Sequence, residues 1–323
     1  MKNGFCGICL FFLLFFVMTA CGNEGIESAI PPSAELSSAQ QAWETGVLPD
    51  SPNGTHQWLF ARGLEILRRH ADLPGVRAKL AWLDAPGCLS QVRQGLFDAD
   101  FLSKYTGARW DLSPTSGIFG FLMAVPTYAA HFYDPDSGKT YTGKVSPTAD
   151  EMIRERLDAI RTAMSPGEPS VACHELGVAS HFMGDIAQPM HAALFTGKNR
   201  PIYLHGNIEG YAMDIQDRYL AEDWDGTPSG DVESLVLETA VRSKQRWPDT
   251  FAAIRDAYQS RGCWFSWRLR DNPDCWQGDA ALDGWIGESI LDAQVTLARF
   301  LYLVDFAPTQ DLDTTQHLVE QAP

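Results

Sequence analysis

Apolar side chains recur every three to four residues along most of the chain, which is the spacing that buries one face of a helix. Segments with this spacing are 56–71, 75–95 with a break at Pro86 and Gly87, 147–164, 169–187, 205–220, 231–259 and 281–306. No alternating apolar and polar pattern of useful length indicates a strand. The pattern therefore predicts an all-α protein that forms a single multi-helix domain.

Two stretches lack the helical spacing. Residues 96–101 are expected to be irregular, and they contain Asp98 and Asp100. Residues 102–147 are rich in aromatic side chains and are broken by Gly and Pro, so we expect mainly loops there, with His131 in the sequence HFYDPD.

Composition and charge narrow the class of protein. The chain has 323 residues, of which 45% are hydrophobic, and this is enough for a substantial core. Its formal net charge is -16, which argues against an extended basic groove, so we expect no nucleic-acid partner. Bound divalent cations would offset part of this charge. We expect the protein to be a monomer.

The first residues predict export from the cytoplasm. Lys2 precedes an almost continuously apolar run at 6–17 that is too short for a comfortable membrane span. Met18-Thr19-Ala20-Cys21 resembles a bacterial lipoprotein cleavage site, and an ordinary signal peptide is the alternative. We expect a signal peptide or lipoprotein signal over 1–21, a spacer or pro-segment over 22–42, and a disordered tail over 307–323. The protein is then secreted, or it is a cell-envelope lipoprotein anchored through Cys21.

The cysteine spacing predicts one disulfide and leaves a second open. In an oxidising compartment Cys263 and Cys275 are expected to close a local loop, because they flank an Asp-Asn-Pro-Asp turn. Cys88 and Cys173 either pair or stay buried as free thiols, and the sequence does not distinguish these outcomes.

The loop between Cys263 and Cys275 is rich in aromatic and basic side chains, and one more indole follows it. These residues are Trp264, Phe265, Trp267, Arg268, Arg270 and Trp276. Indole and guanidinium groups favour a bilayer interface, so the loop is a candidate for insertion there. An aromatic plug beneath the disulfide explains the same residues equally well.

The strongest chemical signal is a histidine-rich stretch in the middle of the chain. His181 and Asp185 are four residues apart, as are His205 and Glu209, so on helices each pair projects from one face. An intervening proline ends the first helix, which leaves His191 just past the helix end. Imidazole and carboxylate groups together suit zinc. Apolar neighbours predict that the first pair is buried, so we favour a polynuclear zinc site over a solvated ion pair.

Several motifs together resemble one protein family. The histidine-rich stretch contains HFMGDIAQPMHAA and LHGNIEG, which resemble the central zinc motifs of the bacterial zinc-dependent phospholipases C. That family includes the Bacillus-type phosphatidylcholine-hydrolysing enzymes and the catalytic domain of clostridial alpha-toxin. AAHFYDPDSGKTY resembles the family's histidine-containing loop, GTHQWLFARGLEIL its first helix and LDAQVTLARFLYL its last. The resemblance extends over 43–306, which we take as a zinc-dependent phospholipase C domain.

The resemblance implies an all-α domain that binds three zinc ions, at least two of them firmly. The implied ligands are His131, His181, Asp100 and Asp185 for the first ion, His191, His205 and Glu209 for the second, and His56, Asp185 and the backbone of Trp43 for the third. The third ion needs a free amine on Trp43, so the chain must be cut before it, which conflicts with lipid attachment at Cys21. The remaining histidines, His70, His174 and His317, are expected to be ordinary, with His174 placed to support a ligand.

The implied activity is hydrolysis of a phospholipid at a membrane surface to diacylglycerol and a phosphorylated headgroup. Asp100 would serve as general base or only as a ligand, and Phe101 and Tyr128 would surround the headgroup. The acid that contacts choline in the family aligns with Gly46, and Glu44 lies nearby, so the preference for choline stays open.

Two other functions are alternatives. A related nuclease family shares the trinuclear site, but it typically has Asp where this chain has Glu209, and the acidic charge disfavours it. A non-catalytic zinc-binding envelope lipoprotein is the other alternative, although no ligand is missing.

Overall fold

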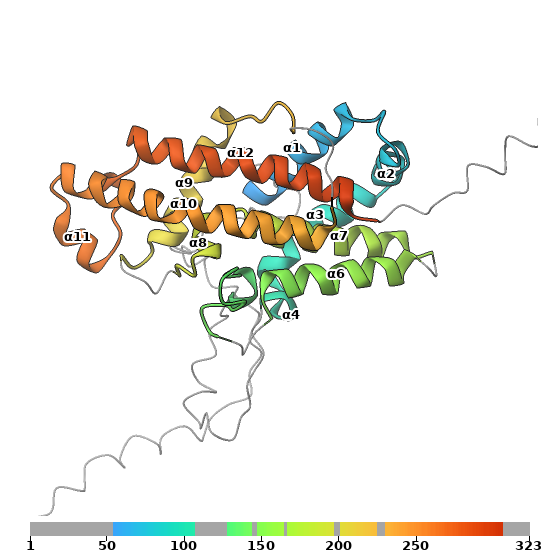
Figure 1. Ribbon diagram of the computed structural model, residues 1–323, viewed down its shortest axis with the longest axis horizontal. Helices are drawn as coiled ribbons and strands as arrows, with labels where there is room; N and C mark the ends of the chain where they lie inside the picture. Colours follow the sequence, from blue (N-terminus) through green and yellow to red (C-terminus); the bar gives the residue numbers. More distant parts are fainter. Residues whose placement is uncertain are drawn as a thin grey trace, which may run out of the picture. The chain divides into compact units, whose positions relative to one another are not determined.

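Helices make up the regular structure of the computed structural model, which describes residues 54–106, 128–143, 147–164, 167–196, 201–224 and 230–305 (Figure 1). Within these ranges there are isolated bridges but no strand, so the prediction of an all-α domain is confirmed. None of the described helices is both long and apolar enough to cross a membrane. The expected signal segment, the spacer, Trp43, Glu44, Gly46 and the C-terminal tail with His317 lie outside the described residues.

The helices of eight or more residues are α1 (Thr55–Arg69), α2 (Val76–Leu83), α3 (Cys88–Phe101), α6 (Ala149–Met164), α7 (Pro169–Ile186), α9 (Leu204–Ile215), α10 (Val232–Ser260) and α12 (Ala280–Leu303). The shorter ones are α4 (Ser103–Thr106), α8 (Pro189–Ala192), α11 (Trp264–Leu269) and the 3-10 turns η2 (Ala129–His131), η3 (Gln216–Arg218) and η4 (Pro273–Cys275). For α1, α6, α7, α10 and α12 these bounds lie within a few residues of the segments expected from the sequence.

Local signals explain where several helices begin and end. α7 begins at Pro169, because a proline in the first turn lacks an N–H that would have no partner there. The next proline, Pro189, cannot continue that helix and instead opens the short helix α8. α10 follows Asp231, whose side chain accepts the backbone N–H of Ser234 at 2.8 Å and so caps the helix.

α7 is the central helix of the described fold. Every residue from Glu175 to Ile186 is buried, because α3, α6, α10, α12 and α1 all pack against it. α12 in turn packs on α1 and α10, and Figure 1 shows α10 and α12 running side by side. A helix covered on all sides is usually apolar all round, so the polar residues His181 and Asp185 must find partners inside the protein.

Two glycines let α3 and α7 cross in unusually close contact. A Cβ atom on Gly95 would lie 2.0 Å from the carbonyl oxygen of His174, and one on Gly177 would lie 2.1 Å from the carbonyl oxygen of Val92. The backbones of the two helices therefore touch where any larger residue would hold them apart.

Two disulfides join parts of the described chain. Cys88 at the start of α3 bonds Cys173 in α7, with 5.4 Å between the Cα atoms, so the two thiols left open by the sequence are paired. Cys263 bonds Cys275 and closes the loop that contains α11. The first disulfide links the same two helices that cross at the glycines.

The expectation of an irregular segment at 96–101 is wrong. These residues continue α3, so Asp98 and Asp100 are helical. Val92, Leu96 and Ala99 follow one another at intervals of four and three residues and are fully buried, so the helical spacing runs through Gly95. Gly95 lies inside this helix and allows its close contact with α7.

Candidate metal centre

Six elements bring eight acidic and imidazole side chains together: α1, α3, η2, α7, α8 and α9. The side chains form three groups, in each of which one ligand atom per residue lies within 4.8 Å of the others: His56, His181 and Asp185; Asp100, His131 and His181; and His191, His205 and Glu209. All eight are buried except Asp100, which is partly exposed. The first two groups share His181, and Asp185 lies 3.7 Å from His191 of the third group, so the three form one continuous site.

In the group around Asp100, three side chains meet at a common point. His181 Nε2 lies 3.4 Å from Asp100 Oδ1 and 3.2 Å from His131 Nδ1. His131 Nδ1 is also 2.8 Å from Asp185 Oδ2, so Asp185 borders this group as well. Two imidazoles and two carboxylates therefore face one another without any lysine or arginine among them.

Asp185 connects the three groups. Its Oδ1 lies 3.4 Å from His56 Nε2, while its Oδ2 lies 3.3 Å from His181 Nε2. The rings of His56 and His181 are stacked at 3.7 Å. Oδ1 is also 3.7 Å from His191 Nδ1. A carboxylate that points one oxygen toward each neighbouring group is placed to bridge two cations.

The third group is assembled from α8 and α9. Glu209 Oε1 lies 3.0 Å from His191 Nε2 and 2.8 Å from His205 Nε2, and the two imidazole nitrogens are 3.1 Å apart. His205 and Glu209 are one turn apart on α9, so the helix spacing places them on one face. Among the described residues, no group bonds the second oxygen of Glu209, although that atom is buried.

Backbone carbonyls set the orientation of three imidazoles. The Nδ1 atoms of His181 and His191 donate to the carbonyl oxygens of Leu96 at 2.9 Å and His131 at 2.7 Å, and the Nδ1 atom of His205 donates to the carbonyl of Phe195. In a neutral ring this donation leaves the lone pair on Nε2, the atom that faces the site. Lone pairs that meet at about hydrogen-bond distance repel unless a proton or a cation lies between them. This donor set fits zinc.

The carboxyl groups stay ionised because of the histidines. Burial by itself would raise the pKa of Asp100, but the charge and hydrogen bond of His181 lower it to about 2. Burial likewise opposes ionisation of Glu209, and His205 and His191 lower its pKa to about 2. The pKa of Asp185 is also held well below its usual range.

The pKa of His181 is shifted in the opposite direction. Burial would lower its pKa, but Asp100 and Asp185 raise it to about 10, so in the absence of a metal this ring holds a proton. The site therefore attracts positive charge, and a proton on His181 occupies the space that a cation would take.

Gln188 belongs to the site, although the sequence did not single it out. Its side-chain nitrogen donates to Glu209 Oε1 at 2.9 Å, and its side-chain oxygen accepts the backbone N–H groups of Met190 and His191. The residue is buried, and it caps α8 while it holds Glu209. A glutamine before a proline is compatible with many turns, so nothing in the sequence marked this role.

The other residues expected near the site lie as follows. Phe101 and Tyr128 are both exposed, and the Tyr128 ring meets the His131 ring edge-on at 5.7 Å between centroids. His70 stacks on Trp224. The ring of His174 bonds Asp98 and Glu175, which belong to none of the three groups, so the role that we expected for His174 in supporting a ligand is wrong.

Sequence similarity to known proteins extends over most of the chain. A phospholipase C of Bacillus cereus is 27% identical over 257 residues, which cover 77% of this chain and 80% of that enzyme. A phospholipase C of Listeria monocytogenes is 28% identical over 293 residues, which cover 88% of this chain and 86% of the relative. No family model matches the chain.

A solved structure, the alpha toxin from Clostridium absonum, superposes with a TM-score of 0.54 at 19% identity and covers 77% of this chain. At that identity the likeness concerns the fold alone. The chain spans 63% of the toxin's length. The identity to enzymes from two genera extends over most of the chain, and the relatives are phospholipases C. The chain therefore resembles the bacterial zinc-dependent phospholipases C over most of its length.

Proposed function

We propose that this protein is a zinc-dependent phospholipase C that hydrolyses the glycerol-side phosphodiester of phospholipids to diacylglycerol and a phosphorylated headgroup. One observation carries the proposal: eight imidazole and carboxylate side chains from six elements meet in one buried site. A polynuclear metal site of this kind suits attack on a phosphodiester.

The proposed ligands divide into three sets. His131, His181, Asp100 and Asp185 would hold the first zinc ion, His191, His205 and Glu209 the second, and His56 and Asp185, with the terminal amine and carbonyl of Trp43, the third. Bound zinc would supply a Lewis acid for the phosphate oxygens and would lower the pKa of a nearby water to about 7.

Asp100 is the residue that we assign as general base. Its side chain is 18% exposed, whereas the other seven are exposed by 10% or less, so it faces the side from which substrate and water arrive. Its lowered pKa keeps the carboxylate ionised at neutral pH, which both a base and a metal ligand require. In the Asp100→Asn variant the other three proposed ligands, His131, His181 and Asp185, should keep the first zinc ion while kcat falls about 10²- to 10⁴-fold. Loss of zinc from this variant would instead make Asp100 a ligand alone.

The headgroup pocket is proposed at the exposed side of the same group. Phe101 follows Asp100 in the sequence, the Tyr128 ring contacts the ring of His131, and both aromatic side chains are open to solvent. Aromatic faces favour a quaternary ammonium group, so choline is the headgroup that we propose first. A panel of choline, ethanolamine, serine and inositol lipids measures this preference directly.

The proposed activity is tested with protein that begins at Trp43. Release of phosphocholine from lecithin should be abolished by a chelator and restored by zinc. The His205→Gln variant should lose the activity, and the matched control His70→Gln, at a histidine outside the three groups, should keep it. Failure of the native protein to release a headgroup from any phospholipid would refute the proposal. Cleavage of single-stranded DNA in its place would indicate a nuclease, and zinc binding without either activity a non-catalytic protein.

We further propose that the protein matures outside the cytoplasm as a monomer. Two disulfides in the described chain support an oxidising compartment. N-terminal sequencing of the released protein distinguishes a chain cut before Trp43 from a lipoprotein that begins at Cys21. A start at Trp43 would permit the third zinc ion, whereas a lipid-modified start at Cys21 would exclude ligation by the Trp43 amine.

A further inference from the structure

Exposed apolar side chains gather on two adjoining segments away from the bundle core. Ile202 and Tyr203 lie before α9, while Trp264, Phe265 and Leu269 lie on α11, and Phe265 is 77% exposed. The segments are joined because the backbone N–H of Asp271 donates to the carbonyl of Ile202 at 2.8 Å, and Ile202 and Arg270 form a parallel bridge. We call these five apolar residues the aromatic surface.

Two guanidinium groups belong to the same surface. Arg268 lies over the ring of Trp264, 5.0 Å from its centroid, and Arg270 lies over the ring of Tyr203 at 4.8 Å. Both aromatic rings are partly exposed, so each arginine sits at the edge of an apolar side chain that contacts solvent. This basic pair stands out in a chain whose formal net charge is -16.

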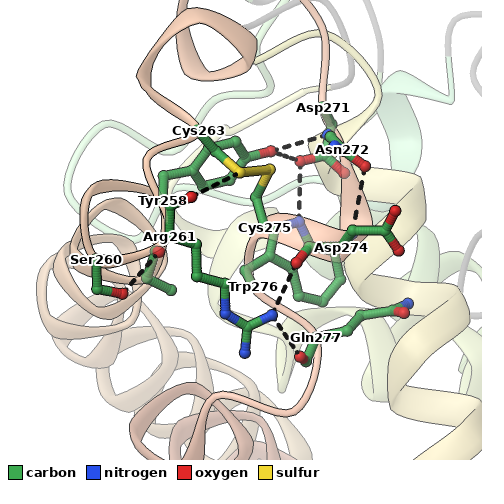
Figure 2. The surroundings of a disulfide bond; sticks show 11 residues. Tyr258, Ser260, Arg261, Cys263, Asp271, Asn272, Asp274, Cys275, Trp276 and Gln277 are labelled. Atoms are coloured by element: carbon green, nitrogen blue, oxygen red, sulfur yellow. Dashed lines mark hydrogen bonds between the residues drawn. A yellow bond between two sulfur atoms is a disulfide. The ribbon is translucent and has the colours of Figure 1, made fainter.

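Figure 2 shows the base of the loop that contains α11, where a disulfide and several hydrogen bonds join residues from its two ends. The disulfide between Cys263 and Cys275 closes the loop, and Trp276 is fully buried beneath it. Asp271 accepts hydrogen bonds from Trp276 Nε1 at 3.0 Å and from the hydroxyl of Tyr258. Arg261 donates to two backbone carbonyls on the far side of the loop.

The two interpretations of the loop therefore apply to different residues. Trp276 lies fully buried in the base, so its insertion into a bilayer is wrong, and Trp267 is half-buried against Phe251 and Tyr258. Trp264 and Phe265 point outward and remain available. The plug and the exposed surface are two sides of one disulfide-closed unit.

The aromatic surface is connected to the candidate metal centre. Tyr203 is two residues before His205, and Asn207 of α9 donates to Asp271 at 2.6 Å. The base of the loop is thus bonded to the helix that carries His205 and Glu209. A ligand seated on the surface would lie beside the segment that leads into the third group.

We propose that the aromatic surface binds the phosphate-bearing interface of a phospholipid bilayer. Indole, phenol and guanidinium groups side by side are the composition that a bilayer interface favours, with apolar rings in the acyl boundary and cations at the phosphates. An exposed apolar cluster with basic edges also exceeds the scattered single residues of an ordinary surface. The proposal rests on the proposed function, because it identifies how the enzyme meets a substrate that resides in a membrane.

The test separates bilayer binding from catalysis. Vesicles of phosphatidylcholine with phosphatidylglycerol are sedimented with the native protein, the double variant Trp264→Ala/Phe265→Ala and the matched control Leu237→Ala, whose leucine is exposed on α10. The double variant should bind vesicles at least about tenfold more weakly, since it removes two rings from the acyl boundary. Its turnover of a dissolved short-chain lecithin should equal that of the native protein. The control should match the native protein in both assays.

Three results are decisive. Unchanged vesicle binding by the double variant, or no vesicle binding by the native protein, overturns the inference and would leave the surface to a protein partner. Equal loss of binding and of soluble turnover would indicate misfolding, and the single variant Phe265→Asp, at the most exposed position, then repeats the test without disturbing the base. Vesicle binding without hydrolysis of any lipid would retain this inference while the proposed function fails.

Discussion

Replacement of Gly177 by alanine tests whether the close crossing of α3 and α7 positions the metal centre. The added Cβ would lie 2.1 Å from the carbonyl oxygen of Val92, well inside the 3.0 Å below which such contacts are essentially not found. Both atoms belong to helix backbones, which cannot rotate away as a side chain can. The helices must therefore separate by about 1 Å at this point.

Separation of the two helices lowers the free energy of unfolding. Overpacking of this kind costs about 3 kcal/mol. Alanine recovers about 1 kcal/mol of helix propensity relative to glycine, so the free energy of unfolding should fall by about 2 kcal/mol. For a domain of this size the melting temperature should fall by about 4 to 8 °C.

The same displacement should weaken zinc binding. His181 is one turn after Gly177 on the same face of α7, and its Nδ1 donates to the carbonyl of Leu96 at 2.9 Å across the crossing. A shift of about 1 Å breaks that bond and releases the ring, so zinc affinity should fall about 10- to 100-fold. Thermal unfolding and chelator competition measure the two effects.

Gly284→Ala is the matched control. Gly284 lies in α12, and an added Cβ there would meet no atom within 4 Å. Its stability should stay the same or rise by up to about 1 kcal/mol, and its zinc affinity should not change. If Gly177→Ala retained both the melting temperature and the zinc affinity of the native protein, the crossing would not be what positions His181.

Three further predictions concern the polar groups. Gln188→Leu removes the amide that holds Glu209, so zinc should leave the third group at about 10- to 100-fold lower chelator concentration, and unchanged retention would contradict this role. Addition of zinc to metal-free protein near neutral pH should release protons, because a zinc ion displaces the proton held by His181. Burial would lower the pKa of His181, but two carboxylates raise it to about 10. A pH-stat that records no proton release would argue against metal binding at this residue. Burial alone would lower the pKa of His174, but its carboxylate partners raise it above 6.5. The stability that it contributes is therefore fully present below about pH 6.5 and is lost as the pH rises through the raised pKa, and His174→Gln should flatten that part of the melting curve against pH.

The sequence was informative where a local pattern decides the structure. The spacing of His181 with Asp185 and of His205 with Glu209 implies one shared helix face, and Pro189 marks the turn between them, so these parts of the site were predictable. Asp100 was expected in an irregular segment, whereas α3 continues through Gly95 to Phe101. Gly95 is required by its contact with the backbone of α7, and no local sequence pattern reveals a contact with a distant helix.

Other features depend on contacts between segments far apart in the chain. Gln188 reaches Glu209 only after α9 folds back onto α8, and the carbonyls that orient three imidazoles belong to residues chosen by packing. The division of the aromatic loop into a buried Trp276 and an exposed Phe265 follows from the place of Asp271, which pairs with α9. Composition alone could not show that Trp276 is buried while Phe265 is exposed.

The disulfide between Cys88 and Cys173 has a consequence for how the protein matures. It ties the helix that ends next to Asp100 to the helix that carries His181 and Asp185, across a sequence separation of 85 residues. Once oxidised, this half of the site keeps its frame whether or not ions are present. Assembly would then follow a fixed order, with the covalent link made first and zinc taken up afterwards from the surroundings. A chain produced in a reducing cell would lack that covalent link, and packing at the two glycines would then hold the helices together.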